Sequence, residues 1–374
     1  MKKRIVEIAS FQGRAGIETF LLDLLRQVDY EQLQIDFLVT NTDEGPFDEE
    51  IIFRGSKIYR ISPLSLNLPA LIRHIKEVNC FFKNNKDIDV VHIHGNTAIS
   101  LLDVLIVKRH GIKKIIGHSH NNWANEPIDR IKHYICKILI SKSFTNRMAC
   151  SQSAWDWMYF GKMNPEMDLI VKNGININKF KYDRNKRKKI RQFLNLGDND
   201  YVIGCVGRFN IQKNHSFLLD SFSKVSCEEK DAKLLLVGEG ELRSQIENQI
   251  LKLGLQDKVI LTGSVENTED YYNAMDLYVM PSIYEGFGIV LIEAQANGLL
   301  CIVSRAIKPE AKVSKYGIKE FALEDGPDNL SKMICKEIRK ENKTRFDNIS
   351  DLQKAGFDIR NSTKQLIKVY RGEQ

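Results

Sequence analysis

The feature that most constrains the fold of this chain is a repeated alternation between short apolar runs and longer segments with helical periodicity. In the first half the apolar runs read RIVEIAS, QIDFLVT, KIYRIS, DVVHIHG, KIIGHSHN and RMACS, and in the second half YVIGCVGR, AKLLLVGEG, VILTGS, LYVMPS and LCIVS. Each run is followed by a helical pattern or a glycine turn, which is typical of parallel sheets assembled from βαβ units. The sequence therefore predicts an α/β protein.

A change in composition divides this alternation into two halves. The chain has 374 residues, which is about twice the length of a typical domain. Residues 178–200 are basic and polar, with eight Lys or Arg from Lys179 to Arg191. Such a run can bind nucleic acid, but it contains few aromatic residues and ends in the amphipathic segment IRQFLNLG. We therefore interpret it as a solvated linker and helix that joins two α/β halves.

The net charge and the cysteines indicate where the protein works in the cell, but they do not indicate its function. A net charge of +7 allows attraction to an anionic ligand, a membrane surface or nucleic acid. Seven cysteines without a C-x-x-C pattern favour reduced thiols inside a cell. No run of eighteen apolar residues exists, and Glu7 interrupts the N-terminal run, which favours a first strand over a signal peptide. We expect a cytoplasmic protein, at most peripheral on the inner face of the cell membrane.

The first predicted strand leads into a glycine-containing turn. In parallel α/β folds, ligands bind beyond the carboxyl ends of the strands, where loops and helix N-termini converge. Gly13-Arg14-Ala15-Gly16 occupies this position, and amides at the start of the following helix can hold an anion. The turn lacks the G-x-G-x-x-G pattern, so a dinucleotide site is not supported. We predict that Gly16 approaches a phosphate or a sugar.

Two later strands end in H-x-H pairs, His92 with His94 and His118 with His120. Side chains at positions i and i+2 of a strand share a face, so either pair could hold a metal ion, and a metallohydrolase is one hypothesis. No later strand end supplies a further ligand, and the H-E-x-x-H pattern is absent. We favour a structural role for the first pair. Because Asn121 follows the second pair, we favour hydrogen bonds from that pair to a hydroxylated ligand.

In the second half, the run YVIGCVGR ends at Gly207 and is followed by Arg208 and then by Lys213 before a helical pattern. Two cations five positions apart at a strand end suit a diphosphate, because guanidinium forms a planar fork and ammonium acts as a point charge. Exposed surface cations are the alternative. The neighbouring glycine turns favour the diphosphate.

The segment PSIYEGFGIVLIEA, residues 281–294, carries two carboxylates in an apolar context. If a helix begins near Gly288, the amides of Gly288 to Val290 point at an anion. Glu285 then lies in the loop that faces the ligand, and Glu293 lies inside the helix. Since carboxylates accept hydrogen bonds from vicinal diols, we predict that both glutamates bind hydroxyl groups.

Together these segments resemble the retaining glycosyltransferase family 4 with the GT-B fold. The resemblance covers nearly the whole chain in order: the turn ending Gly16-Ile17-Glu18, VHIHG, GHSHNN, VKNGIN, Gly207-Arg208 with Lys213-Asn214, LLLVGEGEL and PSIYEGFGIVLIEAQANG. The stretch IIGHSHNN is similar to the branch that makes bacterial exopolysaccharides and capsules. The resemblance implies two Rossmann-like domains facing across a cleft. Residues 1–177 would form the acceptor-side domain, completed by a returning helix at about 357–374, and residues 178–356 the nucleotide-sugar-binding domain.

The resemblance also implies roles for individual residues. Arg208 and Lys213 would hold the donor diphosphate and stabilise charge on the leaving group. Glu293 would bind the ribose, and Glu285 would contact hydroxyl groups of the transferred sugar. His120, and secondarily His118, would lie at the reacting centre. Further donor contacts would come from Gly16, Gly207, Gly286, Phe287, Gly288, Ile289 and Val290, and sugar or acceptor contacts from Asn121 and Asn173.

The reaction implied by the resemblance is transfer of a hexose or N-acetylhexosamine from a nucleotide sugar, with UDP as the nucleotide. The acceptor would be a saccharide or a lipid-linked saccharide in surface polysaccharide biosynthesis. Anomeric configuration would be retained by same-face attack through an oxocarbenium-like state, without a metal, another cofactor or nucleic acid. The chain departs from the family at Leu300, where proline is usual, and at Arg14-Ala15, where a second glycine is common. The second departure leaves the shape of the phosphate turn open.

Alternatives remain for the function and for one segment. A metallohydrolase would use both H-x-H pairs, and a basic non-catalytic protein would bind nucleic acid. The segment DRIKHYICKILISKSFTNR, residues 129–147, suits a membrane-surface helix, or equally an ordinary helix packed on the N-terminal sheet with a solvated basic face.

Overall fold

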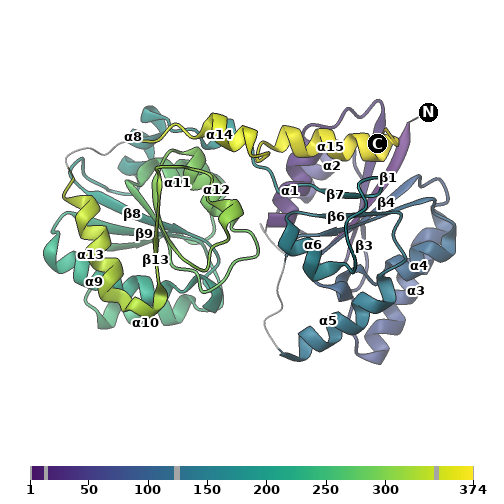
Figure 1. The fold of residues 1–374 in the computed structure, drawn as a ribbon, viewed down its shortest axis with the longest axis horizontal. Helices are drawn as coiled ribbons and strands as arrows, with labels where there is room; N and C mark the ends of the chain where they lie inside the picture. The colour runs from purple at the N-terminus through teal and green to yellow at the C-terminus, as the bar shows by residue number, and fades with distance from the viewer. Residues whose placement is uncertain (1, 12–15, 122–126, 341–344, 374) are drawn as a thin grey trace. The chain divides into compact units, whose positions relative to one another are not determined.

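A computed structural model describes residues 2–11, 16–121, 127–340 and 345–373. The chain divides into two compact units, and we describe each by itself (Figure 1). The N-terminal unit comprises residues 1–175 together with 356–374, and the C-terminal unit comprises residues 176–355. This division lies close to the predicted boundary between residues 177 and 178.

The N-terminal unit is built on a parallel sheet of seven described strands in the order β3-β2-β1-β4-β5-β6-β7. The strands are β1 (Lys3–Ala9), β2 (Leu33–Val39), β3 (Ile58–Arg60), β4 (Val90–Gly95), β5 (Lys114–Ser119), β6 (Asn146–Ala149) and β7 (Asp168–Ile170). All six runs predicted as strands in this half form strands, and β7 is an addition. The strand order reverses between β1 and β4, so their carboxyl ends flank the position where such sheets bind ligands.

Helices cover both faces of this sheet, and the alternation of side chains along the strands separates the two cores. Residues Val6, Ile8, Val91 and Ile93 join one core cluster, and Ile5, Ala9 and Val90, at the alternate positions, join the other. The first face is covered by α3 (Leu68–Asn84), η1 (Ala98–Leu101), α4 (Val104–Val107), α5 (Pro127–Ile140) and α6 (Gln152–Met158). The second is covered by α1 (Gly16–Leu25) and α15 (Ile359–Arg371). Two short elements, α2 (Asp48–Phe53) and η2 (Lys108–His110), complete the described part of the unit.

The C-terminal helix α15 belongs to the N-terminal unit, as the resemblance implied (Figure 1). Its Leu366, Val369 and Tyr370 are fully buried in the second core cluster. The Lys3 ammonium donates to the carbonyl oxygen of Arg371 at 2.8 Å, which places a cation at the C-terminus of the helix. The predicted returning helix is therefore confirmed.

The C-terminal unit contains a second parallel sheet, whose described strands follow the order β10-β9-β8-β11-β12-β13. The strands are β8 (Tyr201–Val206), β9 (Ala232–Val237), β10 (Val259–Leu261), β11 (Leu277–Met280), β12 (Leu300–Ser304) and β13 (Ile318–Phe321). The helical elements are α7 (Ile177–Phe180), α8 (Arg184–Phe193), η3 (Ile211–Lys213), α9 (His215–Glu228), α10 (Arg243–Lys252), α11 (Thr268–Ala274), α12 (Ile289–Ala296), η4 (Pro309–Ala311), η5 (Leu323–Asp325), α13 (Gly326–Ile338) and α14 (Ile349–Lys354). The order reverses between β8 and β11, which carry the segments predicted to bind the donor.

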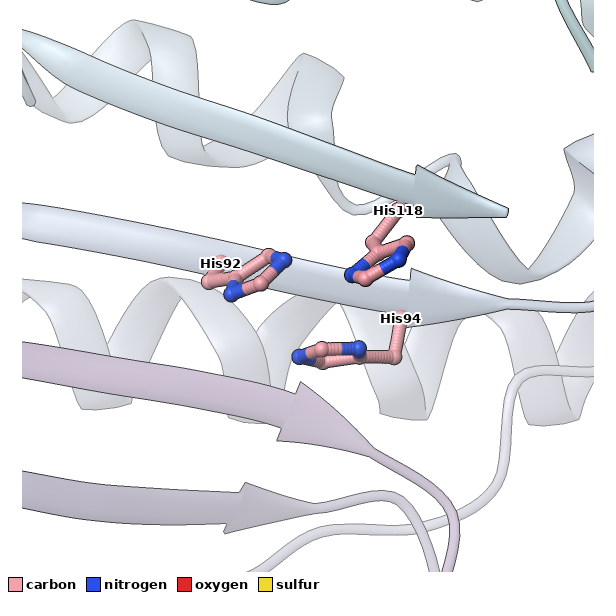
Figure 2. Close-up of side chains that lie close together, drawn as sticks. All are labelled: His92, His94 and His118. Atoms are coloured by element: carbon pink, nitrogen blue, oxygen red, sulfur yellow. The ribbon is translucent and has the colours of Figure 1, made fainter. Parts of the chain in front are cut away.

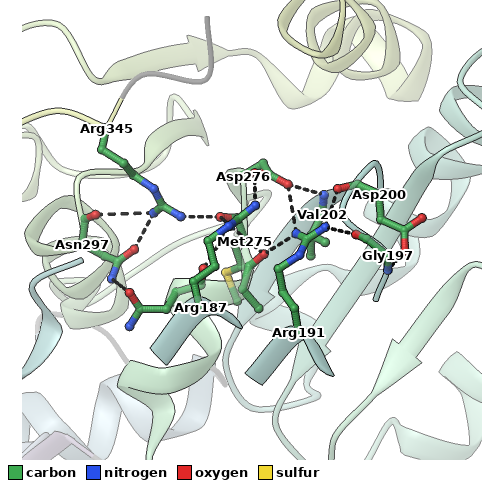
Figure 3. Close-up of polar contacts among 11 residues, drawn as sticks. Arg187, Arg191, Gly197, Asp200, Val202, Met275, Asp276, Asn297 and Arg345 are labelled. Atoms are coloured by element: carbon green, nitrogen blue, oxygen red, sulfur yellow. Dashed lines mark hydrogen bonds and ion pairs between the residues drawn. The ribbon is translucent and has the colours of Figure 1, made fainter. Parts of the chain in front are cut away.

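The basic segment 178–200 is less solvated than its composition predicts. Figure 3 shows that Arg187 and Arg191 of α8 turn inward to Asp276, where the Arg187 guanidinium lies 2.7 Å from the carboxylate. Arg187 also donates to the carbonyl oxygens of residues 273–275 at the end of α11, where the helix dipole favours a cation. Lys186 pairs with Asp270 at 2.9 Å. Because these charges anchor α8 to its own unit, the segment offers a smaller basic surface to nucleic acid than the sequence indicates.

The segment predicted as a membrane-surface or packed helix forms α5 over Pro127–Ile140, on the first face of the N-terminal sheet. Within the described ranges, the structure contains no helix with the length and apolarity needed to cross a membrane.

Candidate functional site

The C-terminal unit brings Lys213 and Glu285 together at the carboxyl ends of β8 and β11. The Lys213 ammonium lies 2.8 Å from one carboxylate oxygen of Glu285, and the Gln212 amide donates to the other oxygen at 3.0 Å. The Asn210 side chain caps η3 by accepting from the Lys213 amide. Both charged side chains are largely buried, with 13% and 5% exposed. This is a fixed cation and carboxylate pair at the switch point of the sheet.

Arg208, the second predicted phosphate ligand, is placed differently. Its side chain is 72% exposed and its guanidinium lies 3.2 Å from the carboxylate of Glu241. Such exposed pairs contribute little to stability, so Arg208 can exchange this partner for an anion at small cost. Of the two predicted cations, Lys213 is held in place and Arg208 is not.

Glycines shape the turn beside this pair. A Cβ atom on Gly238, after β9, would lie 2.0 Å from the carbonyl oxygen of Gly207, after β8. Two strand ends can approach this closely only without that side chain. The sequence predicted Gly207 as a donor contact but did not indicate that Gly238 is needed for this close approach.

The helix α12 begins where the sequence predicts. Gly288 is its N-cap and has a φ of +85°, a conformation that favours glycine. The first amides of a helix lack partners within the helix, so the amides of Ile289 and Val290 belong to the set that binds anions at such ends. The predicted neighbour Phe287 is buried, whereas Gly286 is half-buried.

Glu293 lies one turn into α12 and contacts α11. Its carboxylate is 2.8 Å from the hydroxyl of Tyr272, a residue that is fully buried. Burial raises the pKa of Glu293 to about 7, and the nearby carboxylate of Glu269 adds to this, while the Tyr272 hydrogen bond opposes it. Near neutral pH the group is thus divided between a carboxylate acceptor and a carboxylic acid.

The N-terminal unit gathers all four histidines of the H-x-H pairs at the carboxyl ends of β4 and β5. The ring centroids of His92 and His94 are 4.0 Å apart, as are those of His118 and His120. Across the strands, His92 stacks on His118 at 5.3 Å. All four lie on the face that α15 covers and are buried, His120 with 7% of its surface exposed. Figure 2 shows three of these rings, those of His92, His94 and His118, side by side.

Glu7 of β1, for which the sequence pattern indicated no functional role, is the anionic partner of this cluster. Its carboxylate lies 2.8 Å from Nε2 of His94 and accepts from the Tyr370 hydroxyl of α15 at 2.6 Å. The same hydroxyl lies 2.7 Å from Nδ1 of His92. Burial opposes ionisation of Glu7, yet the hydrogen bonds and charges of the two histidines hold its pKa below the ordinary value. The sequence signal that could have identified Glu7 is a charged residue within a predicted buried strand.

A continuous chain of hydrogen bonds runs from Glu7 through His94 to His120 and Asn173. Nδ1 of His94 lies 2.8 Å from Nε2 of His120, and Nδ1 of His120 lies 3.0 Å from the Asn173 side-chain amide. Burial lowers the pKa of His94 to about 4 and that of His120 well below its ordinary value, so both rings are neutral at neutral pH. Oδ1 of Asn173 can only accept, so Nδ1 of His120 is the donor in this contact. The hydroxyl oxygen of a ligand can therefore replace Oδ1 of Asn173 as its acceptor.

The cluster also offers metal ligands. Ring nitrogens of His92, His94 and His118 lie within 4.8 Å of one another (Figure 2). However, both nitrogens of His94 already contact Glu7 and His120. A hydrolytic metal also needs a position open to water, and these three rings are buried. The arrangement favours a structural and positioning network over a hydrolytic centre.

The remaining predicted residues fall in the N-terminal unit. Gly16 is the first residue of α1 and is exposed. Asn121 is half-buried, and its carbonyl accepts from the Ser119 hydroxyl at 3.2 Å. Residues 13–15 of the turn and Asn122 lie outside the described residues.

Comparison with known families assigns both units. Residues 14–178 match the family described as Glycosyltransferase Family 4, and residues 186–348 match the family described as Glycosyl transferases group 1. The two matches together cover most of the chain, one in each unit.

Individual relatives agree with the family matches. The chain is 27% identical to the putative glycosyltransferase EpsF of Bacillus subtilis, over 99% of this chain and 96% of the relative. It is 24% identical to the capsular polysaccharide biosynthesis glycosyltransferase CapH of Staphylococcus aureus, over 98% of each. It is also 24% identical, over 81% of this chain and 79% of the relative, to the Escherichia coli UDP-Gal:alpha-D-GlcNAc-diphosphoundecaprenol alpha-1,3-galactosyltransferase.

Among solved structures, HepE of Anabaena in complex with UDP superposes with a TM-score of 0.78 at 19% identity, over the whole of both chains. This likeness shows that the chain shares the fold of that protein.

Proposed function

This chain belongs to glycosyltransferase family 4 and is a GT-B glycosyltransferase of polysaccharide biosynthesis, and we propose that it is a retaining enzyme that uses a UDP sugar. In this proposal a hexose or N-acetylhexosamine passes to a saccharide or lipid-linked saccharide acceptor. The observation that carries the proposal is the fixed Lys213–Glu285 pair beside the N-terminus of α12.

The geometry of that pair supports simultaneous contact with a diphosphate and a sugar. An ammonium group has three donors, so Lys213 can keep its bond to Glu285 while it donates to a phosphate oxygen. Each carboxylate oxygen accepts more than one hydrogen bond, so Glu285 can also accept from sugar hydroxyls. Glu293 supplies the acceptor for the ribose diol, as the acidic residue does in dinucleotide sites.

In this reaction the main catalytic task is to stabilise the negative charge that develops on the leaving diphosphate. The bond from the anomeric carbon to the diphosphate oxygen breaks, and the acceptor oxygen forms the new bond on the same face of the sugar. The leaving diphosphate takes the acceptor proton. Lys213, Arg208 and the first amides of α12 stabilise the negative charge, so in this proposal no metal is required. Gly16, Gly207 and the segment from Gly286 to Val290 line the donor.

Residues of the N-terminal unit serve the transferred sugar and the acceptor. Nδ1 of His120 donates to a hydroxyl oxygen, in place of Oδ1 of Asn173, and its ring is held by His94 and Glu7. His118 and Asn121 are further contacts. UDP as the nucleotide is supported by the similarity to HepE, which was solved with UDP. A lipid-linked acceptor is supported by the relative named for a diphosphoundecaprenol substrate. We place the reaction at the cytoplasmic face of the membrane.

A panel of nucleotide sugars, screened by thermal shift and then by transfer, tests the proposal. UDP sugars should stabilise the protein, and the product should keep the donor's anomeric configuration by NMR. Glu285→Ala should abolish transfer while circular dichroism stays unchanged. The control is Glu31→Ala, since Glu31 is an exposed residue of the other unit. Normal transfer by Glu285→Ala would contradict the proposal.

A metallohydrolase is a second candidate function, because three histidines of the cluster could hold a metal ion. Transfer that continues at full rate in EDTA, with no bound metal by elemental analysis, would exclude it. Loss of activity in EDTA that zinc restores would favour it and would contradict metal-independent transfer.

A further inference from the structure

The outward face of α5 is unusually apolar. Ile128, Ile131, Tyr134, Ile135, Ile138 and Leu139 each expose between 52% and 65% of their surface. Spacings of three and four positions place them on one side of the helix. The helix lies at the periphery of the N-terminal unit (Figure 1). Contiguous exposed apolar patches mark binding surfaces more often than single exposed residues do.

Two polar side chains of α5, those of His133 and Lys137, face inward and fix this orientation. His133 accepts from the Ala98 amide at 2.9 Å through Nδ1, and its Nε2 lies 3.0 Å from the Trp157 carbonyl. Lys137 donates to the carbonyls of Asp156 and Trp157, both at 2.8 Å, at the end of α6. Rotating the apolar side inward would break all four contacts and bury charge without partners. The inward contacts of His133 and Lys137 therefore keep the apolar side of α5 on the surface.

The charges around the apolar side have one predominant sign. Residues 127–142 contain four basic residues and one aspartate, and without the inward-facing Lys137 their net charge is +2. Arg130 and Lys132 flank the apolar side, and Lys142 continues it beyond the end of the helix. Tyr134 lies at one edge and packs near the half-buried Trp157. Apolar residues bordered by Lys, Arg and aromatic rings are the composition of helices that lie in a membrane surface.

We propose that α5 docks on an anionic lipid surface, with its six apolar side chains in the headgroup boundary and its basic residues at the lipid phosphates. The purpose of this contact rests on the proposed function, since it would bring a lipid-linked acceptor to the enzyme. A second copy of the chain is a poorer occupant. A symmetric pairing of α5 helices would bring the basic flanks of both copies together.

Vesicle cosedimentation of the full chain tests this surface. The protein should bind phosphatidylcholine vesicles that contain phosphatidylglycerol, and added salt should weaken the binding. Ile131→Gln with Ile138→Gln should lower partitioning on the order of a hundredfold, because two inserted side chains are lost. Lys132→Gln with Lys142→Gln should lower it roughly tenfold. Leu251→Gln is the matched control, because Leu251 on α10 is equally exposed but isolated in the other unit.

Binding of UDP, measured by calorimetry on each variant, separates this proposal from the proposed function. Lost vesicle binding with normal UDP binding in the isoleucine variant supports the lipid surface. Wild-type protein that binds UDP but not anionic vesicles overturns the lipid surface alone. Wild-type protein that binds vesicles but no nucleotide sugar overturns the proposed function alone. A dimer in light scattering that the isoleucine variant abolishes, without vesicle binding, would assign the face to a second copy and overturn the proposal.

Discussion

The two units present contrasting groups at the carboxyl ends of similar sheets. The N-terminal unit buries a network of histidines around Glu7 and closes it with Tyr370 of the last helix. The C-terminal unit instead holds two cations at the strand ends, Lys213 largely buried and Arg208 mostly exposed. The first arrangement is suited to holding neutral rings in fixed positions, and the second to meeting an anion. The same topology thus supports positioning in one unit and electrostatic binding in the other.

The largest expected effect comes from the C-terminal pair. Lys213→Ala should lower kcat/KM for transfer by ~1000-fold or more, because it removes the fixed cation that faces the leaving group in the proposed function. Steady-state rates with the donor found by the nucleotide-sugar panel give the measurement. Lys224→Ala is the control, since Lys224 pairs with Asp328 on the surface. A loss of less than about tenfold in Lys213→Ala would mean that the fixed pair is structural.

Substitutions in the N-terminal network should instead change the stability of the protein. Glu7→Gln should lower the free energy of unfolding by ~2–3 kcal/mol, because it removes the buried charge to which His94 and Tyr370 bind. Urea denaturation measures the change. Hydrogen exchange should rise in residues 359–371 and stay constant in the C-terminal unit. Glu31→Gln, in an exposed turn, should change stability by no more than ~0.5 kcal/mol. An equal rise of hydrogen exchange in both units would contradict the proposed difference between them.

The stabilities of the two units should also differ in their dependence on pH. The pKa of His94 falls from 6.5 to about 4 on folding, and those of His118 and His120 also fall. Their contribution to stability is present above pH 6.5 and is lost as the pH falls toward 4, by up to ~1.4 kcal/mol per pH unit for each histidine. The pKa of Glu293 rises from 4.5 to about 7, so its contribution is present below pH 4.5 and is lost as the pH rises toward 7. In the same unit, burial lowers the pKa of His215 from 6.5 to about 4, so the contribution of His215 changes in the opposite direction and offsets that of Glu293.

Hydrogen exchange between pH 4.5 and 7, corrected for intrinsic exchange rates, measures these slopes unit by unit. The N-terminal unit should gain protection as the pH rises. Glu293→Gln should leave the contribution of His215 unopposed, so that the C-terminal unit also gains protection as the pH rises, and the N-terminal slope should not change. Equal slopes in both units of the wild-type protein would show that the buried histidines of the N-terminal unit do not govern the difference.

The contrast also explains what the sequence could and could not predict. All eleven apolar runs form strands, because buried parallel strands have a strong local signature. The additional strands β7 and β13 are only three and four residues long, and most of their residues are incompletely buried, so no apolar run marks them. The start of α12 at Gly288 was predictable from local chemistry. The pairing of Lys213 with Glu285 was not, because 72 positions separate them and only the fold brings β8 beside β11.

The N-terminal network shows the same limit more strongly. The H-x-H pairs indicated a shared face, but Glu7 lies 87 positions from His94, and Tyr370 lies 363 positions from Glu7. No local pattern relates residues so far apart. The exposure of Arg208 was likewise invisible, since its strand-end position equally fits a fixed cation.

The smallest expected effect separates a fixed cation from an exposed one. Arg208→Ala should lower kcat/KM only roughly tenfold, because this side chain must leave Glu241 and become ordered before it contacts a phosphate, which offsets part of its attraction. Arg208→Lys should recover most of the rate, and Glu241→Gln should leave it unchanged or slightly raised. If Arg208→Ala were as damaging as Lys213→Ala, the guanidinium would have to be fixed by the bound donor. The contrast within the C-terminal unit would then hold only for the ligand-free protein, and positioning would be a property of the donor as much as of the fold.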